Sequence, residues 1–169
     1  MINRMASIVY QPPREEIERA KSLVLEIYDA IPDFECVPGC ADCCGTIKFT
    51  YIERQIILEY ARKNNIKIEM VSATKNCPVL DENNRCKIYP ARPLICRLFG
   101  VVDHELLRCP YRQPKTLIPI DLALECLRIV DEISDELKIY GQVLDQTERR
   151  VRNLVKRLKK YKRRCQVED

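Results

Sequence analysis

Hydrophobic residues recur at helical spacing in three stretches of the chain, and this pattern predicts a mainly α-helical fold. Residues 13–30 begin with a proline and acidic residues, as the first turn of a helix often does. The apolar face of this stretch consists of Ile17, Ala20, Val24, Ile27 and Tyr28. Thr50 and Glu53 have the spacing of a capping box, which predicts a second helix that ends near Arg62.

The third stretch, from Pro119 onward, has the spacing of a heptad seam. Its seam positions alternate in steps of four and three: Cys126, Val130, Ile133, Leu137, Tyr140, Leu144, Thr147, Val151, Leu154, Leu158 and Tyr161. Gly141 is the only breaker, so the stretch forms one long helix or two helices that fold back there. An apolar seam of this length must be covered, by the chain itself, by a second copy or by another subunit. We expect a homodimer or a complex with a protein partner through the C-terminal helix.

Composition and charge agree with a soluble globular protein and restrict its partners. The 169 residues are 46% hydrophobic and 32% charged, and no apolar run is long enough to cross a bilayer. The N-terminus lacks the apolar core of a secretion signal, so we expect a cytoplasmic protein. Residues 149–164 hold ten Lys or Arg and no acid, which leaves 19 bases against 25 acids elsewhere. Because the basicity is confined to this helix end, an acidic protein partner or a simple solvated end is favoured over nucleic acid.

Cysteine is the outlier in the composition, with ten residues beside a single histidine. In a cytoplasmic protein such usage favours metal or redox chemistry over disulfides. One group, with Gly39 inside it and Gly45 directly after it, falls within nine residues: Cys36, Cys40, Cys43 and Cys44. A second group follows: Cys77, Cys86, Cys96 and Cys109. Short spacings with Gly39 and Gly45 let a backbone turn around a metal ion, so the first group predicts a chelating loop.

The second group is arranged by turns. Residues 81–84 are a turn signal that brings Cys77 and Cys86 together in a short hairpin, and a proline-bracketed bend returns Cys96. The other two cysteines have simpler interpretations. Cys126 lies on the helical seam and predicts core packing, whereas Cys165 predicts an exposed free thiol. The lone His104 is interpreted as a loop side chain rather than a ligand.

The cysteine motifs resemble a known family. The run Cys-x3-Cys-x2-Cys-Cys, then Cys-Pro-x-Leu, then Cys-x-Ile-Tyr-x-x-Arg-Pro-x-x-Cys-Arg is similar to the YkgJ-type cysteine-cluster (CxxCxxCC) family over roughly residues 34–110. That family is described as a zinc- or iron-chelating domain and is widely labelled an iron–sulfur protein. The matching residues are Cys36, Cys40, Cys43, Cys44, Cys77, Cys86, Cys96, Tyr89, Arg92, Pro93 and Arg97, with Cys109 as a looser match. Three residues separate Cys36 from Cys40, where the family is often described with two.

Two arginines of the motif have two open interpretations. Arg92 and Arg97 can bind the cofactor by donating hydrogen bonds to sulfur and offsetting the negative charge of a thiolate cluster. Alternatively, they hold carboxylates or loop carbonyl groups. Tyr89 predicts a core side chain with a hydrogen-bonded hydroxyl group rather than a catalytic phenol.

These patterns predict a small helical domain around a cysteine-rich metal-binding core with at most a short hairpin, plus a long C-terminal helix or helical hairpin. We expect residues 1–118 to form the metal-binding domain, 119–164 the heptad segment and 165–169 a tail. The predicted function is metal binding through the eight cysteines of residues 36–109, with an iron–sulfur cluster favoured over zinc. Such a cluster serves electron transfer, or cluster or metal delivery to a partner.

Two other functions stay open. One is an interaction module stapled by two zinc sites of four cysteines each. The other is a metal-dependent enzyme or a methyltransferase accessory. The sequence contains no Ser/His/Asp triad, P-loop or dinucleotide motif that would indicate a catalytic reaction. Whether the protein is an enzyme is therefore left open.

Overall fold

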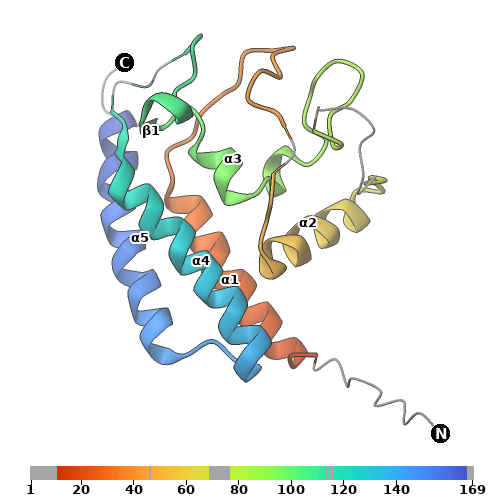
Figure 1. The fold of residues 1–169 in the computed structure, drawn as a ribbon, viewed down its shortest axis with the longest axis vertical. Coiled ribbons are helices and arrows are strands. Elements are labelled where there is room, and N and C mark those ends of the chain that lie inside the picture. The colour runs from red at the N-terminus through yellow and green to blue at the C-terminus, as the bar shows by residue number, and fades with distance from the viewer. Residues whose placement is uncertain (1–10, 46, 69–76, 113, 115, 167–169) are drawn as a thin grey trace, which may run out of the picture.

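Helices dominate the computed structural model, which describes residues 11–45, 47–68, 77–112, 114 and 116–166. The α-helices are α1 (Arg14–Ala30), α2 (Tyr51–Lys63), α3 (Leu94–Leu98), α4 (Ile120–Tyr140) and α5 (Asp145–Gln166). Two 3₁₀ turns, η1 (Tyr89–Ala91) and η2 (Glu105–Leu107), and two short strands, β1 (Val102–Asp103) and β2 (Ile118–Pro119), complete the set. Helices α1, α4 and α5 pack side by side, while α2, α3 and the cysteine-bearing loops gather at one side of them (Figure 1).

Helix α1 confirms the first predicted helix. It begins one residue after Pro13, whose fixed φ favours a helix start, and ends at Ala30. The residues of the predicted apolar face that become fully buried are Ala20, Val24, Ile27 and Tyr28, and Ile17 packs partly buried against them. Their burial against α4, α5 and α2 provides the hydrophobic driving force for this helix.

Helix α2 begins at the predicted capping box. The Thr50 hydroxyl accepts a hydrogen bond from the Glu53 backbone N–H at 3.3 Å, and the Glu53 carboxylate accepts one from the Thr50 backbone N–H at 2.8 Å. This reciprocal pair satisfies two donors that would otherwise lack partners at the helix start. The helix ends at Lys63, one residue beyond the predicted end.

The heptad stretch forms two helices that fold back on each other. Gly141 adopts a left-handed conformation with φ of 73°, and its N–H bonds to the Leu137 carbonyl at 3.1 Å, which ends α4. The buried seam residues are Cys126, Val130, Ile133 and Leu137 of α4 and Thr147, Val151, Leu154 and Leu158 of α5. Because α1, α4 and α5 cover these residues, their burial does not require a second copy of the chain. A homodimer or partner complex stays a prediction.

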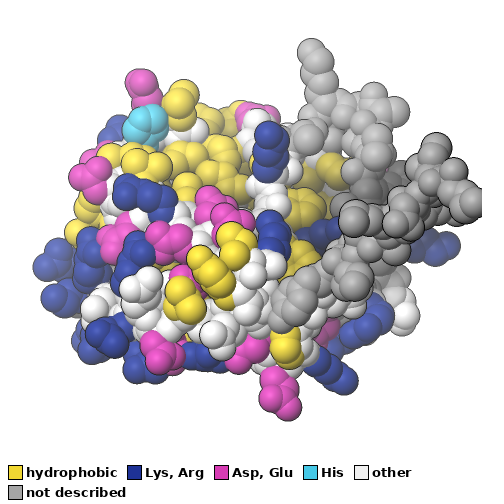
Figure 2. Space-filling model, turned by 60° about the horizontal axis from the view of Figure 1, so that its bottom comes forward, with side chains coloured by type: hydrophobic (Ala, Val, Ile, Leu, Met, Phe, Trp, Pro, Cys, Tyr) yellow, Lys and Arg dark blue, Asp and Glu magenta, His cyan; other side chains and the backbone are white. Residues whose placement is uncertain are grey.

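The basic residues of α5 divide into a paired set and an outward set. Arg157 pairs with Glu125 of α4 at 2.5 Å, Arg150 pairs with Glu132 of α4, and Lys162 pairs with Asp33 at 3.1 Å. The outward bases are Arg149, Lys156, Lys159, Lys160 and Arg163, all exposed, while Arg152 pairs with Glu148 of its own helix. Figure 2 shows Lys and Arg gathered at the left edge, on the side where Figure 1 places α5.

Short pieces of β structure accompany the helices. The predicted hairpin is present as a single antiparallel bridge between Leu80 and Cys86. The parallel pair of β1 and β2, with Val102 opposite Ile118, was not expected, because two-residue strands have no readable periodicity. This pair and the packing of α1 on α4 and α5 join the segment before residue 118 to the heptad segment after it. In the described residues, no helix is long and apolar enough to span a membrane.

An ion pair connects α1 to α2 and makes stability depend on pH. Lys21 is buried, and its ammonium group contacts Glu59 and Glu18, while Lys63 contacts Glu59 at 2.6 Å. These hydrogen bonds hold the pKa of Glu59 at about 2, below its ordinary 4.5. A lowered folded-state pKa contributes stability above pH 4.5, and this contribution disappears as the pH falls toward 2.

Glu59→Gln is therefore expected to lower the free energy of unfolding by about 1 kcal/mol at pH 7, a value reduced for solvent screening. Urea unfolding of both proteins should show this difference shrinking as the pH falls from 4.5 to 2. A difference that stays constant across that range would show that the carboxylate charge is not responsible.

Candidate metal centre

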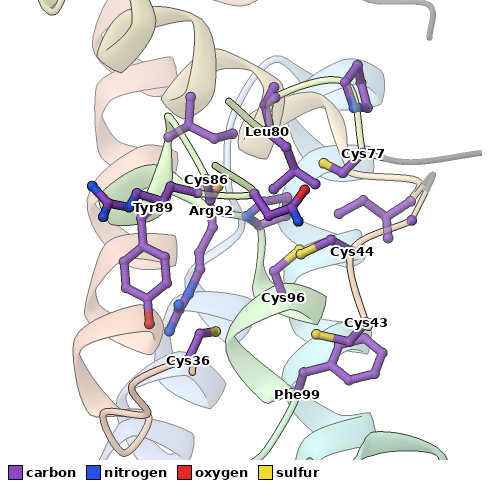
Figure 3. Close-up of a pocket in the computed structure, with 18 of the residues that line it drawn as sticks. Cys36, Cys43, Cys44, Cys77, Leu80, Cys86, Tyr89, Arg92, Cys96 and Phe99 are labelled. Atoms are coloured by element: carbon purple, nitrogen blue, oxygen red, sulfur yellow. The ribbon is translucent and has the colours of Figure 1, made fainter. Parts of the chain in front are cut away.

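Seven of the eight predicted ligands line one pocket. The cavity has a volume of about 570 Å³ and lies between the cysteine-bearing loops, α2 and α3 (Figure 3). The cysteines that line it are Cys36, Cys40, Cys43, Cys44, Cys77, Cys86 and Cys96. Cys109 is half-buried and is not part of the lining, so the structure brings together seven of the eight.

Two consecutive turns shape the first cysteine group. The Cys40 N–H bonds to the Val37 carbonyl at 3.1 Å, and Gly39 between them has φ of 77°. This left-handed conformation is strained for residues with a Cβ, which explains the glycine in the motif. The Cys44 N–H then bonds to the Ala41 carbonyl at 2.9 Å. The turns curl the backbone along the pocket wall, as the chelating-loop interpretation predicts.

An aspartate organises the second group. The Asp81 carboxylate accepts hydrogen bonds from the backbone N–H groups of Asn83 and Arg85, both at 2.8 Å. This local capping closes the turn that the sequence predicts and places Cys86 opposite Leu80 in the antiparallel bridge. Cys77 and Cys86 thus reach the same pocket.

Two long-range hydrogen bonds connect the two groups. Asn84 sits at the tip of the hairpin with φ of 58°, and its side-chain amide donates to the Gly39 carbonyl at 3.2 Å. The Tyr89 hydroxyl donates to the Phe34 carbonyl at 2.6 Å. Tyr89 is 37% exposed, so its predicted place in the core is wrong, although its hydroxyl is hydrogen-bonded as expected.

A buried carboxylate positions the helix that carries Cys96. The Glu53 side chain is 4% exposed, and it accepts hydrogen bonds from the Leu94 N–H at 2.7 Å and from the Tyr28 hydroxyl at 3.0 Å. These bonds tie the start of α3 to α1 and α2. In Figure 3 the side chains of Cys96 and Cys44 point toward one another. Sequence reasoning identified Glu53 as a cap only, because the partners on α1 and α3 are distant in the chain.

Comparison with known families bears on the chemistry of this pocket. Residues 35–114 match the model of the CxxCxxCC family, whose description is "Putative zinc- or iron-chelating domain". The segment is a CxxCxxCC domain. It spans both cysteine groups and the two motif arginines, which confirms the family resemblance, and its description supports metal binding. No curated protein and no solved structure shows significant similarity to the chain.

Arg92 provides positive charge to the pocket of the CxxCxxCC domain. Its guanidinium group stacks on the Tyr89 ring, 3.8 Å from the ring centre, and its buried Nε has no hydrogen-bond partner in the described residues. Burial raises the pKa of the thiols of Cys36, Cys86 and Cys96, the last to about 12, and the charge of Arg92 opposes each rise. Arg92 therefore favours thiolates on several sides of the pocket.

The adjacent cysteines share a proton. The Cys44 thiol donates a hydrogen bond to the sulfur of Cys43, which lowers the pKa of Cys43 to about 6 and raises the pKa of Cys44. The hydrogen bond therefore favours the thiolate form of Cys43, and thiolates are the form of cysteine that binds metals.

Arg97 points away from the thiols. Its Nε donates to the Arg92 carbonyl at 3.1 Å and its Nη2 to the Pro90 carbonyl at 2.5 Å, and its guanidinium group lies 4.2 Å from the ring centre of Tyr28. Of its two predicted roles, the structure shows the holding of loop carbonyls. Arg97 fixes the bend on which Arg92 sits.

The thiols line the pocket without meeting at one point. Among the residues that the structure describes, no group of three His, Cys, Asp or Glu side chains lies close enough to hold a metal ion as placed. Binding would require the loop thiols to move inward. His104 receives a hydrogen bond from the Leu106 N–H at 3.3 Å and caps η2, as its loop assignment predicts. Cys126 is fully buried in the core as expected, and the Cys165 side chain lies outside the described residues.

Gly100 allows close contact between α3 and the segment that leads into Cys36. A Cβ at Gly100 would lie 2.5 Å from the Phe34 ring, and the residue has φ of 86°. Gly100→Ala is expected to lower the free energy of unfolding by about 2–4 kcal/mol, through backbone strain and overpacking. Gly39→Ala is the matched control, because Gly39 has φ of 77° but no atom near its Cβ position, and should lose only about 1 kcal/mol. Equal losses in urea unfolding would show that the Phe34 contact is unimportant.

Proposed function

We propose that the CxxCxxCC domain holds an iron–sulfur cluster through its cysteine thiolates. The observation that carries this proposal is one pocket lined by seven cysteines and no histidine among the described residues. Soft thiolate ligands without imidazole favour iron–sulfur clusters and zinc over other metals. The adjacent Cys43 and Cys44 can bind two irons of one polynuclear centre.

The pocket residues fit such a group. The proposed ligands come from Cys36, Cys40, Cys43, Cys44, Cys77, Cys86, Cys96 and Cys109. The unpartnered Nε–H of Arg92 is buried among them and can donate to a thiolate or sulfide. When bound, a cluster supplies one-electron redox chemistry. The chain supplies the thiolates, the charge of Arg92 and a mostly apolar wall.

Such a centre serves electron transfer, or cluster or metal delivery, and both uses need a partner. We propose a protein with an acidic surface that binds the outward basic residues of α5. These side chains are exposed and regularly spaced along the helix, so they match an acidic surface by charge. Residues of α2 and α3 line the pocket, and these helices lie on the other side of α1 and α4 from α5 (Figure 1).

Anaerobic purification followed by metal and sulfide analysis tests the cluster. We expect a brown protein that contains iron and acid-labile sulfide. Colourless protein with stoichiometric zinc and no sulfide would contradict the proposal. It would favour the second candidate, an interaction module stapled by two four-cysteine zinc sites, which the family description also allows.

Arg92→Gln is expected to weaken metal binding about tenfold, because the variant leaves thiolate charge uncompensated. Competition with a chelator measures this change for iron or zinc. The metal-free variant should be as stable as the wild type or more stable, because the substitution removes a buried donor without a partner. Arg92→Lys keeps the charge and should recover part of the affinity. Unchanged affinity in Arg92→Gln would show that the guanidinium group does not act on the metal.

A further inference from the structure

The pocket extends well beyond the cysteines. Its other side is formed by apolar side chains that cannot bind a metal: Ile47, Phe49, Ile57, Leu58, Ile68 and Val79. Most of the pocket surface is apolar, and the volume of about 570 Å³ falls in the usual range of about 300–1,000 Å³ for small-molecule sites. A metal held by thiolates at about 2.3 Å occupies only the cysteine side. The apolar side remains available when the metal is bound.

The apolar side opens to solvent along α2. Phe49 is 36% exposed and Leu58 is 39% exposed, so large apolar surfaces face water at the pocket mouth. Arg54 and Leu58 are four residues apart on α2 and therefore lie on the same helix face. One face of α2 thus presents an apolar surface with a cation one turn away.

The charges around this mouth are mainly positive. Arg54 of α2 and Arg85 of the hairpin both line the pocket and are exposed. Within the described part of the chain, neither guanidinium group has a hydrogen bond or an ion pair. The one acid in the lining, Glu35, has a side chain that is 93% exposed and pairs with Arg112. An anionic group at this mouth would meet unpaired cations, and its repulsion would come from the thiolates on the other side of the pocket.

We propose that the apolar side of the pocket binds an amphipathic organic anion beside the proposed metal centre. Its apolar body packs against Phe49, Ile57 and Leu58, and its carboxylate, sulfonate or phosphate group binds Arg54 and Arg85. The site consists of side chains other than the cysteines, so it does not require a bound metal. The CxxCxxCC domain thus has a place for a small molecule next to its thiolates, in addition to the metal centre.

Titration of the purified full-length chain with the fluorescent aromatic sulfonate 8-anilinonaphthalene-1-sulfonate tests this site. We expect one saturable site, from which decanoate displaces the dye and decylamine does not. Leu58→Asp and Arg54→Gln should each weaken dye binding at least tenfold. Two matched controls should leave it unchanged: Leu25→Asp, at a leucine of α1 that is also 39% exposed, and Arg62→Gln, at an exposed arginine of α2 outside the pocket.

Three results would overturn this inference. They are the absence of saturable binding, equal losses in the controls, and displacement by decylamine as effective as displacement by decanoate. Metal content measured on every sample keeps the two proposals separate. A protein that binds dye at this site but never binds metal would refute the metal centre and leave the anion site standing.

Discussion

Cys96→Ser is expected to remove most of the bound metal, whereas Cys126→Ser keeps it. Both thiols are carried by helices, and burial raises the pKa of each to about 12, so the pair is matched in environment. They differ in place, because Cys96 lines the pocket and Cys126 lies in the core of α4. Serine replaces a thiolate ligand by a hydroxyl that binds zinc and iron–sulfur centres poorly. Metal per chain after anaerobic purification measures the difference.

Cys126→Ser should change the stability of the protein even though it does not change the metal content. Cys126→Ser places a hydroxyl on the apolar seam and should lower the free energy of unfolding by about 1–2 kcal/mol with the metal retained. Cys40→Ser, in the first cysteine group, should lose metal as Cys96→Ser does. Full metal retention in Cys96→Ser would remove this residue from the ligand set.

Glu53→Gln is the second large effect that we expect. The buried carboxylate accepts hydrogen bonds from the backbone N–H groups of Thr50 and Leu94 and from the Tyr28 hydroxyl. An amide of the same shape must turn its NH₂ group toward one of these donors. The free energy of unfolding should therefore fall by about 2–4 kcal/mol. Metal content should fall as well, because the start of α3 is no longer held.

Thr50→Ala is the control for Glu53→Gln. It removes the cap hydroxyl of α2 but leaves the bonds of Glu53 to Leu94 and Tyr28, so it should lose about 1 kcal/mol. Urea unfolding of the two variants at pH 7 compares them directly. A loss in Glu53→Gln no larger than the loss in Thr50→Ala would show that Glu53 acts only as a cap.

The helices could be predicted because their signals are local. Pro13, the Thr50 and Glu53 pair and Gly141 act within one turn of their own positions, and the apolar spacing shows which face is buried. The fold-back at Gly141 was one of two open alternatives. The sequence could not choose between them, because the partner of the seam is decided by tertiary packing. The strands β1 and β2 were missed because two residues contain no period.

The candidate site was predictable in its cysteines and less so in its surroundings. Spacing and turn residues identified the chelating loop and the hairpin but left open whether they form one centre or two. They also included Cys109, which the structure leaves outside the pocket lining. The direction of Arg97 depends on Tyr28 of α1, more than sixty residues away in the chain. The apolar side of the pocket was not foreseen, since an exposed leucine such as Leu58 is common on helix surfaces.

X-ray absorption at the metal edge of the anaerobically purified protein tests the central claim most directly, because it identifies the atoms bound to the metal. We expect sulfur as the only protein ligand of the metal. An iron–sulfur cluster would also show iron neighbours, whereas zinc would show sulfur at about 2.3 Å. A first shell dominated by nitrogen or oxygen at about 2.0–2.2 Å would contradict it. That result would mean that the pocket cysteines do not hold the metal.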